Sequence, residues 1–427
     1  MLSLIGVIIA FAVIIFLIRK KFNFGLSLII GSIILALFSF AVVDEPVDVG
    51  KAFVEATIYS FKEQRFDFET IELAILMTLI FILAKIMQET GSIEKLIDSL
   101  RGFFSKGGTL GVIPAIYGLM PVPGGALFSA PSIDKEGEKY HLKKDQKNFL
   151  NVWFRHIWFP IYPISSAMIL VCSADFSNID IYQLIYANIP SFIVFILIGI
   201  IFLKIFIKNS QKPEKPKKTD KKGLIYLLPP IVPILIYICV YLAGFSDIKY
   251  YQRSIFILGV LVSIILMYFL LNVDWKKYLQ IVKKSISFKL ALAIFGIMIF
   301  RQIFEVSEAN QALADYISIL PFPAILIVIL VPMLLGLLTG YNLGAIALSY
   351  FLVEPFFAAT NLNLIGLTSI VFMSSLVGYL ISPIHLCNVV SSEYLKTDTT
   401  RMYKMYIPAV TVLLLVQLMF VYLFYLN

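Results

Sequence analysis

Apolar runs of about 20 residues recur along almost the whole length of this 427-residue chain. A run of that length crosses the hydrocarbon core of a bilayer as an α-helix. The composition agrees, because 59% of the residues are hydrophobic and only 15% are charged. The sequence therefore predicts an all-α polytopic membrane protein, with spans near residues 2–18, 24–43, 70–89, 148–172, 181–207, 223–243, 253–272, 288–305, 364–392 and 405–425.

The formal net charge of +8 does not predict nucleic-acid binding, because the basic residues lie in short loops between the apolar runs. The positive-inside rule places lysine-rich loops in the cytoplasm. It predicts a multi-pass protein of the cell (inner) membrane, with the N-terminus and C-terminus outside and a basic cytoplasmic linker at 208–222. The same rule requires the two remaining apolar stretches, 108–133 and 321–357, to enter and leave the membrane on one side as re-entrant hairpins.

The linker divides the chain into two segments with the same order of elements. Residues 1–207 and 223–427 each read as three helices, a re-entrant hairpin, a broken helix and a final helix. Within the hairpins, "IPAIYGLMPVPGGA" aligns with "VPMLLGLLTGYNLGA", which pairs Gly118 with Gly336. Because the second segment starts from the opposite side of the membrane, we expect two inverted repeats, an architecture that recurs in secondary transporters.

Proline, glycine and small polar residues interrupt four apolar segments, namely both hairpins and the broken helices at 148–172 and 364–392. Such an interruption either kinks a transmembrane helix or leaves backbone N–H and C=O groups unpaired. Unpaired groups persist at membrane depth only where they face protein or a wet cavity, and four interruptions at corresponding places favour a binding role. The breaks are Pro121–Gly125, Pro160–Ser166, Thr339–Gly344 and Ser382–Asn388.

Unpaired N–H groups at the start of a half-helix attract anions, and unpaired carbonyls at its end attract cations. Arg155 lies beside one break, and its guanidinium either faces the bundle interior or reaches back to the cytoplasmic interface. His156 and His385 are either core histidines with satisfied hydrogen bonds or proton-coupling groups. We expect the substrate and ion site to contain Pro121, Pro123, Gly124, Gly125, Arg155, His156, Ser165, Ser166, Gly340, Tyr341, Asn342, Ser382, His385 and Asn388.

Three segments, "MPVPGGALFSAP", "NVWFRHIWFPIYP" and "GYLISPIHLCNVVSSEY", resemble the signatures of an uncharacterised prokaryotic integral membrane family. This family is a domain of unknown function in the ion transporter superfamily, distantly similar to sodium/dicarboxylate, citrate and gluconate carriers. The resemblance covers essentially the whole chain. It implies a homodimer with a scaffold of first spans, a mobile domain of hairpins and broken spans, and elevator-type alternating access. The Ser-Asn-Thr tips of sodium/dicarboxylate relatives are replaced here by "PVPGG" and "TGYN", so neither sodium coupling nor a dicarboxylate is implied.

These observations predict a secondary active transporter of a small organic or inorganic anion, driven by a sodium or proton gradient. We expect no cofactor, no metal and no enzymatic activity, with the lipid bilayer as partner. A cation/proton antiporter and an intramembrane hydrolase are the alternatives. The histidines form no HExxH motif, so the best nucleophile and base are Ser165 or Ser166 with His156. The three cysteines have no spacing typical of a metal site.

Overall fold

The chain is described from a computed structural model, which covers residues 2–39, 49–61, 63–101, 103–104, 107–119, 124–208, 221–244, 251–271, 273–309, 315 and 322–426. Two expected site residues, Pro121 and Pro123, and most of the linker at 208–222 lie outside these ranges.

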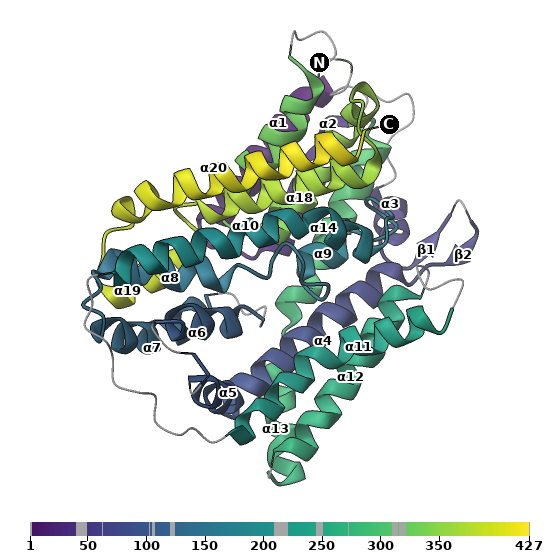
Figure 1. Cartoon of the computed structure of the whole chain (residues 1–427). Helices are drawn as coiled ribbons and strands as arrows, with labels where there is room; N and C mark the ends of the chain where they lie inside the picture. The colour runs from purple at the N-terminus through teal and green to yellow at the C-terminus, as the bar shows by residue number, and fades with distance from the viewer. Residues whose placement is uncertain are drawn as a thin grey trace.

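Helices make up most of the described chain (Figure 1). The first half contains α1 (Leu2–Arg19), α2 (Phe24–Ser39), α3 (Val49–Glu55), α4 (Glu69–Glu89), α5 (Ser92–Arg101), α6 (Thr109–Gly118), α7 (Ala126–Glu138), α8 (Lys144–Arg155), α9 (Ser166–Val171) and α10 (Ile181–Ile207). A two-stranded antiparallel hairpin, β1 (Tyr59–Ser60) and β2 (Arg65–Phe66), lies between α3 and α4. The second half contains η1 (Lys221–Leu227), α11 (Leu228–Leu242), α12 (Gln252–Leu270), α13 (Trp275–Ser285), α14 (Phe288–Val306), α16 (Ala324–Thr339), α17 (Asn342–Val353), η2 (Glu354–Ala359), α18 (Leu364–Leu380), α19 (Leu386–Leu395) and α20 (Thr399–Phe424).

The predicted helical, multi-pass character agrees with this structure. Among the described residues, seven helical segments are long and apolar enough to cross a membrane, and α17 together with η2 is one of them. The sequence analysis did not anticipate α3, the β hairpin or the separate helix α13. The segment that forms α13, "WKKYLQIVKKS", is too polar to read as a span.

Both predicted broken helices are observed as pairs of shorter helices. The first break separates α8 from α9 and contains Pro160 and Pro163, and the second separates α18 from α19 and contains Pro383. Proline has no N–H to donate and clashes with the preceding turn, so neither segment continues as one helix. Each break therefore creates a new helix N-terminus inside the molecule.

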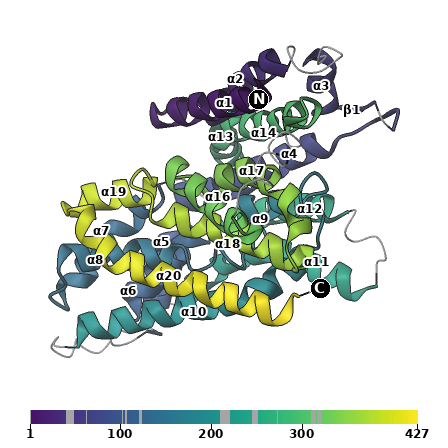
Figure 2. The same cartoon turned by 90° about the horizontal axis from the view of Figure 1, so that it is seen from above.

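The helices form two groups. In the broken-helix bundle, α6 to α10 pack with α16 to α20, and α10, α18 and α20 lie side by side (Figure 1). In the flanking bundle, α2 packs on α1 and α14, and α4 packs on α12 and α14. Figure 2 shows α1, α2 and α14 along one side of the molecule, with α7, α8, α19 and α20 on the other.

The two halves of the chain contact each other reciprocally within the broken-helix bundle. Helix α7 packs on α19, and α17 packs on α9; likewise α8 packs on α20, and α18 packs on α10. The glycines paired by the sequence alignment have the same role in packing. A methyl group at Gly118 would overlap the backbone of α8 at Arg155, and one at Gly336 would overlap the backbone of α18 at Ser375.

Candidate functional site

A cavity of about 120 Å³ lies where the helix breaks of the two halves meet. A buried water needs only about 10–15 Å³ by the same measure, so this space holds several waters or a small solute. The lining comes from both halves of the chain. Nine of the fourteen predicted site residues line it, namely Gly124, Arg155, His156, Ser165, Ser166, Gly340, Tyr341, Asn342 and His385.

Three helices of ten or more residues begin at this cavity. The residues that precede them are Gly125 for α7, Tyr341 for α17 and His385 for α19, and in the described part of the chain none of these three residues forms a side-chain capping hydrogen bond. The first N–H groups of a helix have no partner within the helix and carry partial positive charge. The short helix α9 also begins here, but Ser165 caps it by accepting a hydrogen bond from Met168 N.

Arg155 supplies the full positive charge of the cavity. It is the last residue of α8 and is 3% exposed, and its Nη1 donates a hydrogen bond to the carbonyl oxygen of Tyr117 at 2.8 Å. This burial favours the alternative in which the guanidinium faces the bundle interior over the one in which it reaches back to the cytoplasmic interface. A methyl group at Gly125 would overlap the guanidinium, so the absence of a side chain at that position makes room for the charge.

The two histidines lie against each other, with ring centroids 4.8 Å apart. His156 Nδ1 lies 2.6 Å from the carbonyl oxygen of Val152, so it is the protonated nitrogen, and Nε2 lies 3.3 Å from the hydroxyl of Tyr379. His385 is fully buried, and neither of its ring nitrogens has a hydrogen-bond partner of normal geometry among the described residues. His156 is therefore oriented by its neighbours, whereas the described residues leave both buried nitrogens of His385 without a hydrogen bond of normal geometry.

Gly340, Tyr341 and Asn342 form the turn between α16 and α17. Gly340 has a φ of +59°, a left-handed conformation that a glycine adopts without strain. Asn342 Oδ1 accepts a hydrogen bond from Ser375 Oγ of α18 at 3.0 Å, while its Nδ2 has no partner in the described structure. The amide N–H₂ is thus a further donor at a cavity wall.

Two predicted site residues have a different place. Ser382 Oγ donates to the carbonyl oxygen of Leu337 at 2.7 Å, and Asn388 Nδ2 donates to that of Leu380 at 3.1 Å. Neither residue is part of the cavity lining. Asn388 pairs a carbonyl group that the break between α18 and α19 would otherwise leave unsatisfied, and Ser382 pairs one in the last turn of α16. Both residues therefore stabilise the backbone at helix ends beside the cavity.

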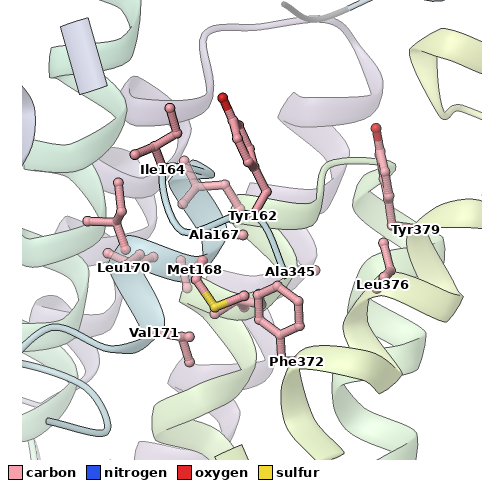
Figure 3. Close-up of a cluster of buried hydrophobic side chains, with 14 of the residues drawn as sticks. Tyr162, Ile164, Ala167, Met168, Leu170, Val171, Ala345, Phe372, Leu376 and Tyr379 are labelled. Carbon is pink, nitrogen blue, oxygen red and sulfur yellow. The ribbon is translucent and has the colours of Figure 1, made fainter. Parts of the chain in front are cut away.

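The sequence analysis left eight lining residues out of the predicted site: Gly118, Phe159, Tyr162, Ala167, Leu343, Tyr379, Leu386 and Cys387. Figure 3 shows Tyr162 and Tyr379 above an apolar cluster in which Met168 of α9 lies beside Ala345 of α17 and Phe372 of α18. This cluster forms the apolar support beneath the cavity. Tyr162 and Cys387 belong to the predicted breaks Pro160–Ser166 and Ser382–Asn388, which is the signal that could have included them, but no local pattern places Tyr379 at the site.

The sequence matches the family described as "Protein of unknown function (DUF401)" over residues 1–423. No curated protein matches the chain.

Proposed function

The chain belongs to this family of unknown function, and we propose that it is a secondary active transporter of a small organic or inorganic anion. The observation that carries the proposal is the convergence of Arg155 and the uncapped N-termini of α7, α17 and α19 on one buried cavity. Helix N-termini and a guanidinium both stabilise negative charge. The described lining contains no aspartate or glutamate to oppose them.

The proposal includes elevator-type alternating access, which the division into two bundles supports. The flanking bundle would act as the scaffold and the broken-helix bundle as the moving domain, with the substrate cavity carried wholly inside the latter. The resemblance to the ion transporter superfamily supports this division and adds a homodimer to the proposal. The reciprocal contacts between halves support a pair of inverted repeats.

The lengths of the hairpin helices support re-entrant loops. Helices of 10 residues (α6) and 13 residues (α7) extend roughly 15 and 20 Å, short of a hydrocarbon core about 30 Å thick. Helix α17 continues into η2, and together they are long enough to cross a membrane. The proposal that α16 and α17 form a re-entrant hairpin therefore depends more on the charge pattern of the loops. The orientation would bring α6 and α7 in from the cytoplasm and α16 and α17 in from outside.

Contacts between distant loops support the proposed sidedness. Arg253 forms an ion pair with Glu69, and Asn363 N donates to the carbonyl oxygen of Tyr425. Each of these two contacts joins segments assigned to the outside. Gly223 N donates to Ser99 Oγ, which joins two segments assigned to the cytoplasm. These contacts fit a protein of the cell membrane with both termini outside and the linker inside.

The alternative functions have less support. A cation/proton antiporter would use carbonyl ends and a deep carboxylate, and the described lining has no carboxylate. An intramembrane hydrolase would need Ser165 or Ser166 to donate to His156. The ring nitrogens of His156 are instead directed at Val152 and Tyr379, and Ser165 Oγ caps α9.

The first experiment is a thermal-stability screen of the purified protein with phosphate, sulfate, acetate, succinate and citrate. Each anion is added as its sodium and its potassium salt at two pH values. An anion that binds only the folded state raises the melting temperature, and a dependence on sodium or pH identifies the coupling ion. The anion selected is then tested for uptake into proteoliposomes under the matching gradient.

Arg155→Ala should weaken binding of that anion by about tenfold or more, because a hydrogen bond to a charged group contributes about 1.5–3 kcal/mol. Arg155→Lys should retain part of the affinity, because it keeps the charge but loses the two-pronged geometry. Arg401→Ala, which alters an exposed arginine of α20, is the matched control and should bind normally. Normal anion binding by a folded Arg155→Ala protein would refute the assignment of this site.

A further inference from the structure

Three potential metal ligands from both halves of the chain meet at one wall of the cavity. They are the ring nitrogens of His156 and His385 and the Sγ atom of Cys387, all within 4.8 Å of one another. All three residues are buried, and all three line the cavity. Imidazole nitrogen and thiolate sulfur together form the ligand set that binds Zn²⁺ and similar transition-metal ions.

The individual residues are already arranged as ligands. The Val152 carbonyl holds the proton of His156 on Nδ1, which leaves the lone pair of Nε2 directed away from the backbone. Metal-bound histidines are oriented in this way by a backbone carbonyl or carboxylate on the second nitrogen. His385 has no hydrogen-bond partner for either nitrogen among the described residues although it is fully buried, and Cys387 is a free thiol. A bound ion would satisfy His385 and Cys387 together.

The spacing is close to that of a tetrahedral site. At metal–ligand distances of about 2.0–2.3 Å, the ligand atoms of such a site lie about 3.3–3.8 Å apart. The cluster has to contract by roughly 1 Å at its widest separation, a movement within reach of small side-chain rotations. The Tyr379 hydroxyl, 3.3 Å from His156 Nε2, would be displaced by the ion.

We propose that His156, His385 and Cys387 bind a divalent transition-metal ion of the Zn²⁺ class, with a fourth coordination position open to the cavity. Because the site contains a single thiolate and two neutral imidazoles, the complex with a divalent ion keeps a net positive charge. Arg155 lines the same cavity, so an anion at the open position would contact both the metal and the guanidinium. This site goes beyond the proposed transport function and does not depend on it.

Cobalt(II) binding tests the site directly, because Co²⁺ replaces Zn²⁺ and reports its ligands optically. The full-length protein is purified without a polyhistidine tag and titrated with Co²⁺ in the absence of any added anion or gradient. We expect one equivalent per chain, a thiolate-to-cobalt charge-transfer band, the visible bands of tetrahedral Co²⁺, and loss of both on adding Zn²⁺. Absence of the charge-transfer band would overturn the proposal.

Matched variants assign the ligands. Cys387→Ser should abolish the charge-transfer band, and His385→Ala should weaken Co²⁺ binding by at least about tenfold. The remaining cysteines and histidine provide controls, since Cys172→Ser, Cys239→Ser and His141→Ala should each keep the wild-type spectrum. A charge-transfer band that survives in Cys387→Ser would also overturn the proposal.

A second measurement keeps Cys387 in place, so it does not depend on whether Cys387→Ser folds. In a protein carrying Cys172→Ser and Cys239→Ser, Zn²⁺ should slow alkylation of Cys387, as read by mass spectrometry, and should raise the melting temperature. An alkylation rate unaffected by Zn²⁺ would contradict the site. Arg155→Lys should leave the Co²⁺ spectrum unchanged, so failure of the transport proposal and failure of the metal proposal give different results.

Discussion

Individual residues at the cavity divide into those that face a ligand and those that maintain the helix break. Arg155, His385 and Asn342 present donors or lone pairs to the cavity. Asn388 belongs to the second kind, because its Nδ2 donates to the carbonyl oxygen of Leu380 at the end of α18. Both kinds are polar, buried and close to a proline or glycine of a helix break, so they look alike in the sequence.

Asn388→Leu should therefore reduce stability without specifically reducing anion binding. The substitution leaves the Leu380 carbonyl unsatisfied in a buried position, at a cost of about 1–3 kcal/mol. Thermal denaturation should show a lower melting temperature, while the increase produced by a saturating anion should stay close to that of the wild type. A normal melting temperature with lost anion stabilisation would instead place Asn388 in the binding site.

At the scale of elements, the four helix breaks have unequal roles. The breaks that begin α7, α17 and α19 leave uncapped N-termini at the cavity, whereas Ser165 caps α9. Gly118 lets α6 approach α8 closely, and Gly336 lets α16 approach α18 closely. The sequence alignment of the two halves pairs these two glycines. This equivalence supports reading the two helix pairs as oppositely oriented hairpins.

Single-cysteine labelling tests that orientation. In a protein with its three native cysteines replaced by serine, Lys139→Cys, at the end of α7, should react only with reagent on the cytoplasmic side. Thr360→Cys, at the end of η2, should react only from outside. Glu308→Cys, at an exposed position after α14, should share the side of Thr360→Cys, because both ends of a re-entrant hairpin lie on one face. Labelling of these last two positions from opposite sides would make the α16–α17 segment a crossing.

At the scale of the whole molecule, an ion pair joins the two bundles. Arg301 of α14 lies 3.1 Å from Asp175, which belongs to the loop between α9 and α10. Burial raises the pKa of the Asp175 carboxyl above its ordinary value of 3.8, and the Arg301 charge opposes that shift. Glu69 and Asp67 add to the rise in this pKa, and Arg253 opposes it.

Arg301→Gln should lower the melting temperature most at neutral and alkaline pH. The folded protein binds a proton at Asp175 more tightly than the unfolded chain does, so the ionised carboxylate is unfavourable and Arg301 offsets this cost. The loss in the free energy of unfolding should be about 1 kcal/mol, because the pair is partly exposed. This loss should shrink as the pH falls through the raised pKa of Asp175.

The double variant Arg301→Gln/Asp175→Asn is the control for this prediction, because it lacks the carboxyl that titrates. Its difference from the single variant Asp175→Asn should depend on pH less than the deficit of Arg301→Gln does, and the dependence that remains belongs to Glu305 and Glu354, which also interact with Arg301. A deficit in Arg301→Gln that grows on acidification would contradict the proposed role of Asp175.

The sequence by itself determined the helical spans and the positions of the breaks, because bilayer thickness and the geometry of proline act locally along the chain. It also identified nine of the residues that line the cavity. Only the tertiary structure decided that the Arg155 side chain is buried at the cavity, that Ser382 bonds the end of α16 and Asn388 the end of α18, and that His156 meets Cys387. These outcomes depend on helix packing between the two halves, which brings together residues far apart in the chain and is not encoded in the spacing of either segment.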